Sequence, residues 1–157
     1  VVYSSTAIRD HLAAGKPGHA AALLGRPFEI EGRVLHGDRR GRELGFPTMN
    51  VGLGEYLLPA LGVYAVRVAV EEGEAADWHD GVANLGRRPT VDGTRLLLEP
   101  HVFDFDQDVY GRRVRVALIE YIRAERRFDG LDALKRQIGE DCAAAKRILK
   151  TRAAGAT

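Results

Sequence analysis

The chain has 157 residues, of which 45% are hydrophobic and 29% charged, and its 23 Lys and Arg against 22 Asp and Glu give a formal net charge of +1. This composition suits one domain with a sizeable core and excludes a largely disordered chain. The longest stretches without a charged side chain, residues 44–54 and 56–66, have 11 residues each, well short of the ~20 needed to cross a bilayer. We therefore expect no membrane helix and, at a net charge near zero, no general binding to nucleic acid.

The single cysteine and the N-terminal sequence favour a reducing compartment. Cys142 has no second cysteine with which to form an internal disulfide, and the chain does not open on a basic segment followed by an apolar run, which is the pattern of a secretory signal. We expect a cytoplasmic protein. Cys142 is predicted to be a core residue rather than a nucleophile, because free cysteines are among the most buried residue types.

Residues 4–25 are predicted to form a short helical segment in two parts. The hydroxyl side chains at positions 4–6 can accept hydrogen bonds from the free N–H groups of a helix start, and Gly15 can end that helix. A second turn rich in Ala and Leu, residues 19–24, ends at Gly25. The unit is small and can pack only one face against the rest of the chain.

From residue 28 the pattern changes to short runs typical of β-strands, separated by Gly and Pro. Because no helix of 10 or more residues lies between these runs, an antiparallel barrel or sandwich of five or six strands is favoured over an alternating α/β fold. The predicted strands are residues 28–35, 62–70, 80–85, 95–103 and 114–122.

A helix is predicted to follow the strands, with Asp129 at its N-terminus as a cap. Its apolar residues recur every three or four positions, so they share one face that should lie against the barrel. They are Leu131, Leu134, Ile138, Cys142, Ala145, Ile148 and Leu149. Residues 151–157 are predicted to be a frayed, disordered tail.

Several familiar sites can be excluded from spacing. Gly37 and Gly41 are too close for a Walker A loop and no Gly-Lys-Ser/Thr follows them, and the dinucleotide fingerprint that begins at Gly52 fails at Leu57. The alternating aspartates of residues 104–108 lack the glycine and the final glutamate of a calcium loop. The five histidines have no spacing typical of zinc ligands.

The run from Gly37 to Asn50 contains the groups needed to bind a phosphate. Its glycines allow backbone N–H groups to approach an anion, and its arginines can neutralise phosphate charge. Thr48 and Asn50 lie two residues apart, so on an extended strand their oxygens share one side, which suits Mg²⁺ when phosphates supply the negative ligands, while Met49 points the other way toward the core. An exposed hairpin loop with solvated arginines remains the alternative.

Glu99 is the second candidate. It ends the apolar run of residues 96–98 and precedes Pro100, so it can lie at a strand end beside a cleft and accept a proton from a substrate hydroxyl. A solvated surface carboxylate remains the alternative.

Taken together, these segments resemble the riboflavin kinase domain, in order, over residues 31–149. The segments that carry the resemblance are Gly41–Asn50; Leu58–Pro59 with Gly62–Tyr64; Gly81–Thr90; Glu99; Asp108–Gly111; and Ile122, Arg123 and Phe128, followed by the Leu-spaced helix. The resemblance implies a six-stranded antiparallel Greek-key barrel with a C-terminal helix. It also implies transfer of the ATP γ-phosphoryl group to the 5′-hydroxyl of riboflavin, which gives FMN and ADP.

The resemblance further implies a role for each matching residue. Thr48 and Asn50 match the residues that hold Mg²⁺ and the phosphates, and Glu99 matches the general base. Arg123 and Phe128 match a flap on the flavin side. The glycine loop matches a flap over the nucleotide, and the nucleotide-binding positions are Gly37, Arg42, Gly45, Pro47, Thr48 and Asn50.

Residues 3–9 resemble the end of the adenylyltransferase module that precedes the kinase in bacterial bifunctional FAD synthetases. The implied organisation is residues 1–26 as the end of that N-terminal FMN adenylyltransferase module, 27–150 as the kinase domain and 151–157 as the tail, so FMN but not FAD is the expected product. The alternatives are a flavin- or nucleotide-binding barrel without catalysis, which serves in regulation or assembly, and a small nucleic-acid-binding barrel. The second lacks support, because aromatic residues are only 7% of the chain.

Overall fold

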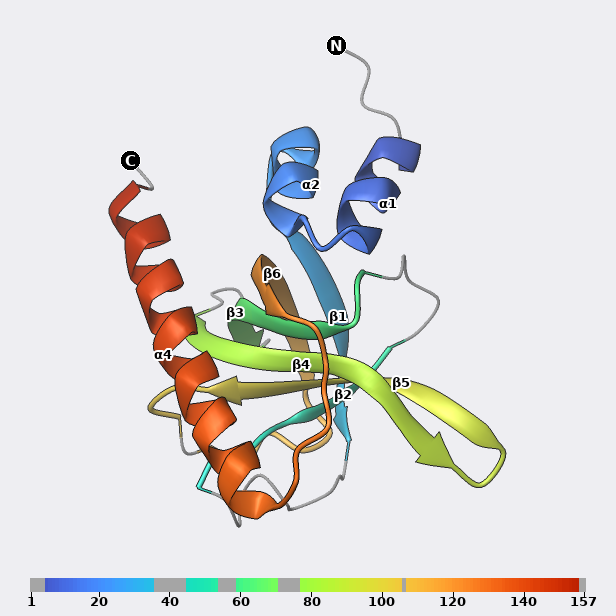
Figure 1. The fold of residues 1–157 in the computed structure, drawn as a ribbon. Coiled ribbons are helices and arrows are strands. Elements are labelled where there is room, and N and C mark those ends of the chain that lie inside the picture. The colour runs from blue at the N-terminus through green and yellow to red at the C-terminus, as the bar shows by residue number, and fades with distance from the viewer. Residues whose placement is uncertain (1–4, 36–44, 54–58, 71–76, 106, 156–157) are drawn as a thin grey trace.

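A computed structural model describes residues 5–35, 45–53, 59–70, 77–105 and 107–155. Within these ranges, two short helices precede six strands and a long C-terminal helix (Figure 1). The elements are α1 (Ser5–Ala13), α2 (Pro17–Leu24), β1 (Phe28–Leu35), β2 (Asn50–Gly52), β3 (Gly62–Val70), β4 (Trp78–Thr90), β5 (Gly93–Val102), β6 (Arg113–Arg123) and α4 (Leu131–Gly155).

The six strands close into an antiparallel barrel in the order β1-β2-β5-β4-β3-β6. Strands β3, β4 and β5 follow one another as neighbours, while β2 lies beside β5 and β6 lies beside β3. Three sequential strands flanked by a strand from elsewhere in the chain form a Greek key. The predicted fold class is therefore confirmed, and α4 runs along one side of the barrel (Figure 1).

Strand β4 extends five residues beyond its predicted end at Leu85, and β5 begins two residues before Arg95. These extensions pair as the arms of a hairpin, from Gly86 opposite Leu97 to Thr90 opposite Gly93, and the hairpin projects from the barrel (Figure 1). Polar residues of the hairpin do not alternate with apolar ones. The alternation that identifies a strand in the sequence therefore ends before strand β4 does.

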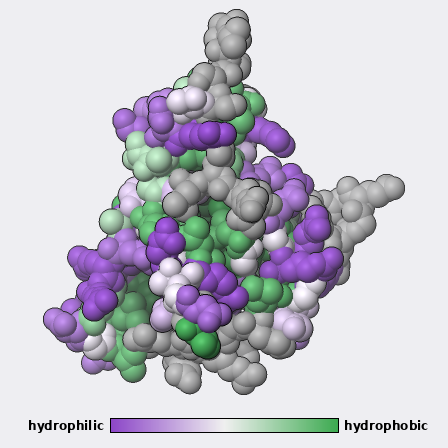
Figure 2. All heavy atoms as spheres, turned by 90° about the vertical axis from the view of Figure 1, so that its right-hand side faces the viewer, coloured by the Kyte–Doolittle hydropathy of each residue, from purple (hydrophilic) through white to green (hydrophobic). Residues whose placement is uncertain are grey.

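Charged and apolar side chains are unevenly distributed over the surface. On the face shown in Figure 2, apolar side chains gather below the N-terminal helices and hydrophilic side chains flank them. Single apolar residues, among them Val91 at the hairpin turn and Trp78, are also exposed.

No helix in the described part of the chain combines the length and apolar character needed to span a bilayer.

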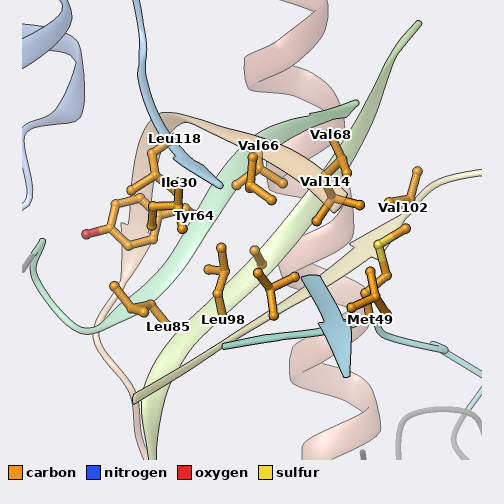
Figure 3. Packing of buried hydrophobic residues seen from close by; sticks show 14 of the residues in the cluster. Ile30, Met49, Tyr64, Val66, Val68, Leu85, Leu98, Val102, Val114 and Leu118 are labelled. Atoms are coloured by element: carbon orange, nitrogen blue, oxygen red, sulfur yellow. The ribbon is translucent and has the colours of Figure 1, made fainter. Parts of the chain in front are cut away.

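The main core lies inside the barrel, where apolar side chains from all six strands converge (Figure 3). Val114, Val116 and Leu118 alternate with outward residues on β6 and are fully buried. Met49 is also inside, as its position between Thr48 and Asn50 predicts. The hydroxyl of Tyr64 points away from the cluster and donates to the Ala60 carbonyl oxygen at 2.5 Å, and burial raises the pKa of this phenol.

A second apolar layer joins the outside of the barrel to α4 through Val63, Ala65, Val82, Ala117, Ile119, Cys142, Ala145 and Leu149. Cys142 is buried, as predicted, and its burial raises the pKa of the thiol. The expected frayed tail is wrong for residues 151–155, because α4 continues to Gly155. Nη2 of Arg67 donates a hydrogen bond to the Leu149 carbonyl oxygen at 3.3 Å, and this bond holds this end of the helix against β3.

The two N-terminal helices pack against one end of the barrel. The turn between them contains Gly15 at φ +74°, where the backbone passes so close to Tyr121 that an added Cβ would be 3.2 Å from its ring. The Leu12 carbonyl oxygen accepts a hydrogen bond from the Ala60 N–H at 2.8 Å. Gly25 ends α2 in the left-handed conformation, as predicted. Glycine is favoured at both positions because other residues are strained at positive φ.

Candidate active site

A cleft of about 700 Å³ lies on the outer face of β4 and β5, bounded by the start of α4 and by the connection 124–130 between β6 and α4. Four residues nominated from the sequence line it: Thr48, Glu99, Arg123 and Phe128. They come from three parts of the chain that are far apart: the segment before β2, strand β5, and the end of β6 with the connection that follows it. The barrel and α4 therefore bring these residues to one cavity.

Strand register places Asn50 and Glu99 side by side. Val51 pairs with Leu98, and the Met49 N–H donates to the Pro100 carbonyl oxygen at 2.9 Å. Between these two pairs, Asn50 falls opposite Glu99 on the outer face, and Glu99 is in turn opposite Asn84 of β4. Directly opposed Cβ atoms in antiparallel strands are about 4.5–5.5 Å apart. Asn50, Glu99 and Asn84 thus form a row across three strands, in which Asn50 is only 5% exposed.

The same register places Thr48 opposite His101, one row further along the outer face. The His101 ring is fixed by the Pro47 carbonyl oxygen, 2.8 Å from its Nδ1, and by the edge of Phe46, with ring centroids 5.7 Å apart. Pro47 therefore contributes to this region through its backbone. His101 lines the cleft and was not predicted from sequence, although it lies two residues from Glu99 and so on the same side of the strand.

Glu99 pairs with Arg88 of β4, with 2.5 Å between Oε1 and Nη2. The side chain of Glu99 is 19% exposed, and its Oε1 is shielded from solvent. Nη1 of Arg88 lies 3.4 Å from Oε1 of Glu125, which also accepts a 2.8 Å hydrogen bond from Asn84 Nδ2. Sequence reasoning missed Arg88 and Glu125 as site residues, because only the register and the path of the β6–α4 connection bring them to Glu99.

Arg123 holds the end of β6 against α4. Its Nε and Nη2 donate to both carboxylate oxygens of Asp141, at 2.9 and 2.7 Å, and Gln137 donates to the same carboxylate at 3.0 Å. Two guanidinium groups lie near the Phe128 ring, with the Cζ atoms of Arg123 and Arg126 at 5.6 and 4.9 Å from its centroid. The guanidinium of Arg123 is thus engaged by protein groups while its side chain lines the cleft.

The remaining nominated residues lie elsewhere or outside the described residues. Gly45 is exposed at φ +87° and is not among the residues that line the cleft. Gly37 and Arg42 belong to the segment 36–44, which lies outside the described residues. The described residues include no group of three or more His, Cys, Asp or Glu side chains that could hold a metal ion.

The fold and the cleft define the class of protein. It is a closed antiparallel barrel with a carboxylate, that of Glu99, in a cleft on the outer face of its strands. A family model described as riboflavin kinase (Flavokinase) matches residues 24–149, so the chain belongs to the riboflavin kinase family. The resemblance to the riboflavin kinase domain that the sequence shows is confirmed.

Individual relatives agree with this assignment. A bifunctional riboflavin kinase/FMN adenylyltransferase from Haemophilus influenzae is 48% identical over 143 residues, which are 91% of this chain and 46% of that protein. A riboflavin kinase structure from Trypanosoma brucei has a TM-score of 0.56 at 27% identity, covering 79% of this chain and 78% of that one. A structure described as a macrolide-efflux protein from Streptococcus pneumoniae has a TM-score of 0.80 at 38% identity, over 88% and 45% of the two chains. The chain thus spans about half the length of the curated relatives it matches.

Proposed function

We propose that this chain transfers the γ-phosphoryl group of ATP to the 5′-hydroxyl of riboflavin and releases FMN and ADP. The observation that carries the proposal is the outer row of the barrel, in which a carboxylate, Glu99, lies beside the amide of Asn50 and one row from Thr48, in a chain of the riboflavin kinase family. Phosphoryl transfer depends mainly on such positioning and on charge neutralisation.

Glu99 is the proposed general base. It accepts the proton of the ribityl hydroxyl as that oxygen bonds to the γ-phosphorus, and the bond from phosphorus to the bridging oxygen breaks so that ADP leaves with the electron pair. The proton remains on Glu99 until solvent removes it. A base of this kind contributes ~10²- to 10⁴-fold to the rate.

Thr48 and Asn50 are the proposed protein ligands of Mg²⁺ and the phosphates. Thr48 lines the cleft, whereas Asn50 is not among the lining residues and lies next to Glu99 by strand register, at 5% exposed. Both side chains carry neutral oxygens, which fit a hard cation whose negative ligands come from a nucleotide. When bound, Mg²⁺ neutralises charge on the phosphates. The glycine loop with Gly37, Arg42 and Gly45, together with Pro47, is proposed to cover the nucleotide.

Arg123 and Phe128 are the proposed flavin-side residues. The aromatic ring of Phe128 lines the cleft close to two guanidinium groups, and Arg123 fixes this wall to α4 through Asp141. The reaction is assigned to the cytosol, because ATP is available there and the one cysteine remains reduced.

The test is a chromatographic assay of the purified chain with riboflavin, ATP and Mg²⁺ that follows FMN and FAD separately. FMN without FAD is expected, with loss of the product in EDTA and in Glu99→Gln. The relatives are named for two activities, and the kinase activity alone is proposed for this chain. Riboflavin binding without FMN formation would instead favour a binding barrel without catalysis.

A further inference from the structure

Arg88 lies between two carboxylates that belong to different walls of the cleft. Its Nη2 is 2.5 Å from Glu99 Oε1 on β5, and its Nη1 is 3.4 Å from Glu125 Oε1 on the β6–α4 connection. The guanidinium also donates to the Arg87 carbonyl oxygen at 3.1 Å. Because its donors are arranged in a rigid planar fork, an arginine can hold two acceptors in one fixed relation.

Glu125 is held close to the sheet by more than Arg88. Asn84 donates to its Oε1 at 2.8 Å, and Asn84 is the register partner of Glu99. Gly86, two residues further along the same face of β4, leaves the space that this carboxylate occupies, because an added Cβ there would collide with Glu125 Oε1. The sheet surface is thus shaped to receive Glu125 beside Arg88.

Charge makes Arg88 necessary to this arrangement. Without its guanidinium, Glu99 and Glu125 would be two carboxylates with no cation between them, and like charges at short range repel each other. An ion pair with an exposed partner contributes little to stability, and the Arg88 side chain is 40% exposed. Loss of Arg88 should therefore change the stability of the fold little. It should have a larger effect on the position of Glu99, the proposed reacting carboxylate.

We infer that Arg88 is a positioning residue that sets the orientation of Glu99 and links Glu99, through Glu125, to the wall formed by the β6–α4 connection. This inference rests on the proposed function, because it assigns Arg88 to the reaction in which Glu99 is the base. Arg88 acts through the two carboxylates and takes no proton itself. Displacing a reacting group by about 1 Å can cost ~10²-fold in rate.

The kinetic test compares Arg88→Met with Arg88→Lys and Glu125→Gln. Arg88→Met should lower kcat about 10- to 100-fold, whereas the KM values for riboflavin and ATP should change less than about threefold. Arg88→Lys should recover part of the loss, since it restores the charge without the fork. Glu125→Gln should lower kcat only a few-fold, and the double variant with Arg88→Met should be no worse than Arg88→Met alone.

Arg95→Met is the matched control. Arg95 is the register partner of Arg88 on the same hairpin and lies outside the residues that line the cleft, so its loss removes the same charge without touching Glu99. A kcat for Arg88→Met within twofold of wild type, or equal to that of Arg95→Met, would overturn the inference.

A second measurement is independent of activity. Crystal structures of Arg88→Met and of the control Arg95→Met compare the position of the Glu99 carboxyl group, whose Oε1 lies 2.5 Å from Nη2 of Arg88 in the wild type. The carboxyl group should leave this position in Arg88→Met and keep it in Arg95→Met.

The two measurements separate the two proposals. A wild-type chain that makes no FMN, but whose Glu99 carboxyl group moves in Arg88→Met, would refute the proposed function and retain the pairing of Arg88 with Glu99. An active wild type whose Glu99 carboxyl position and kcat are both unchanged in Arg88→Met would refute the role of Arg88 alone.

Discussion

Strands β4 and β5 present two chemically opposite faces. Toward the barrel interior they place Ala83, Leu85 and Leu98, each at most 1% exposed. Toward the cleft the alternate positions place Asn84, Arg88, Glu99 and His101. Because successive side chains of a strand point to opposite faces, neighbouring residues such as Leu98 and Glu99 belong to different environments. The comparison indicates that stability and chemistry are separated by one position in the chain.

This separation allows the two faces to be tested with adjacent substitutions. An inward change should reduce the free energy of unfolding and affect activity only through the folded fraction. An outward change should affect turnover or ligand binding and leave stability nearly unaltered. A result that crosses these categories would show that the two faces are coupled.

The largest expected effect is that of Glu99→Gln on turnover. The amide keeps the shape of the side chain but cannot act as a base, so kcat should fall by ~10²- to 10⁴-fold, while riboflavin affinity and the unfolding midpoint should remain close to wild type. Initial rates of FMN formation and fluorescence titration of riboflavin measure these two quantities. Unchanged turnover would remove Glu99 from the mechanism.

Leu98→Ala, at the adjacent position, should have the opposite profile. Leu98 is fully buried in the barrel, so its truncation leaves a cavity and should cost about 2–5 kcal/mol of unfolding free energy. Urea denaturation measures this loss. Per folded molecule, kcat should stay within a few-fold of wild type. A fall in kcat comparable to that of Glu99→Gln would contradict the separation of the two faces.

Apolar runs bounded by Gly and Pro were what the sequence revealed best. β1 and β3 were predicted with the bounds they have in the structure, and β3 is buried on both faces. β2 has only three residues, too few for a pattern, and the second half of β4 was missed because its polar residues lie on the projecting hairpin. Local pattern thus identifies strands where one face is buried in a core.

The candidate site was predictable only in part. Thr48, Asn50 and Glu99 were named from residue type and resemblance, and strand register accounts for their proximity. Arg88 and Glu125 were missed because their interaction with Glu99 depends on pairing between strands and on the path of a connection. The pattern of residues within a single segment does not show which residues of other segments lie beside it.

Asp141→Asn tests whether Arg123 fixes the proposed flavin-side wall of the cleft to α4. Loss of one partner of a buried ion pair costs about 3–5 kcal/mol. Because the Arg123 side chain is 21% exposed, we expect a smaller loss of about 2 kcal/mol in the free energy of unfolding, together with a raised KM for riboflavin. Thermal unfolding and initial rates measure both. Wild-type stability would show that the β6–α4 junction does not depend on this pair.

Thr48→Val should weaken binding of the Mg²⁺ nucleotide by about tenfold, because it replaces the hydroxyl by a methyl group and removes one oxygen from the proposed site. Thr48→Ser keeps that oxygen and is the matched control, so it should bind nearly as well as wild type. Calorimetric titration with MgADP measures the affinity. Equal affinity in Thr48→Val and Thr48→Ser would contradict the assignment of Thr48 as a ligand.

The smallest expected effect belongs to the interior face and depends on pH. Burial raises the pKa of Tyr64 in the folded protein above the value of about 10 for an exposed phenol. Above that pH the unfolded chain releases the proton while the folded protein retains it, so stability should fall as pH rises and should be fully present below pH 10. Tyr64→Phe should abolish this part of the decline, about 1 kcal/mol at pH 11, and should itself cost about 1 kcal/mol at neutral pH through loss of the bond to Ala60. Denaturation at pH 8 and pH 11 measures the difference. If both proteins lost the same stability at alkaline pH, Tyr64 would not be the source of the loss. The source would then be another partly buried group such as Tyr121, because burial also raises the pKa of its phenol.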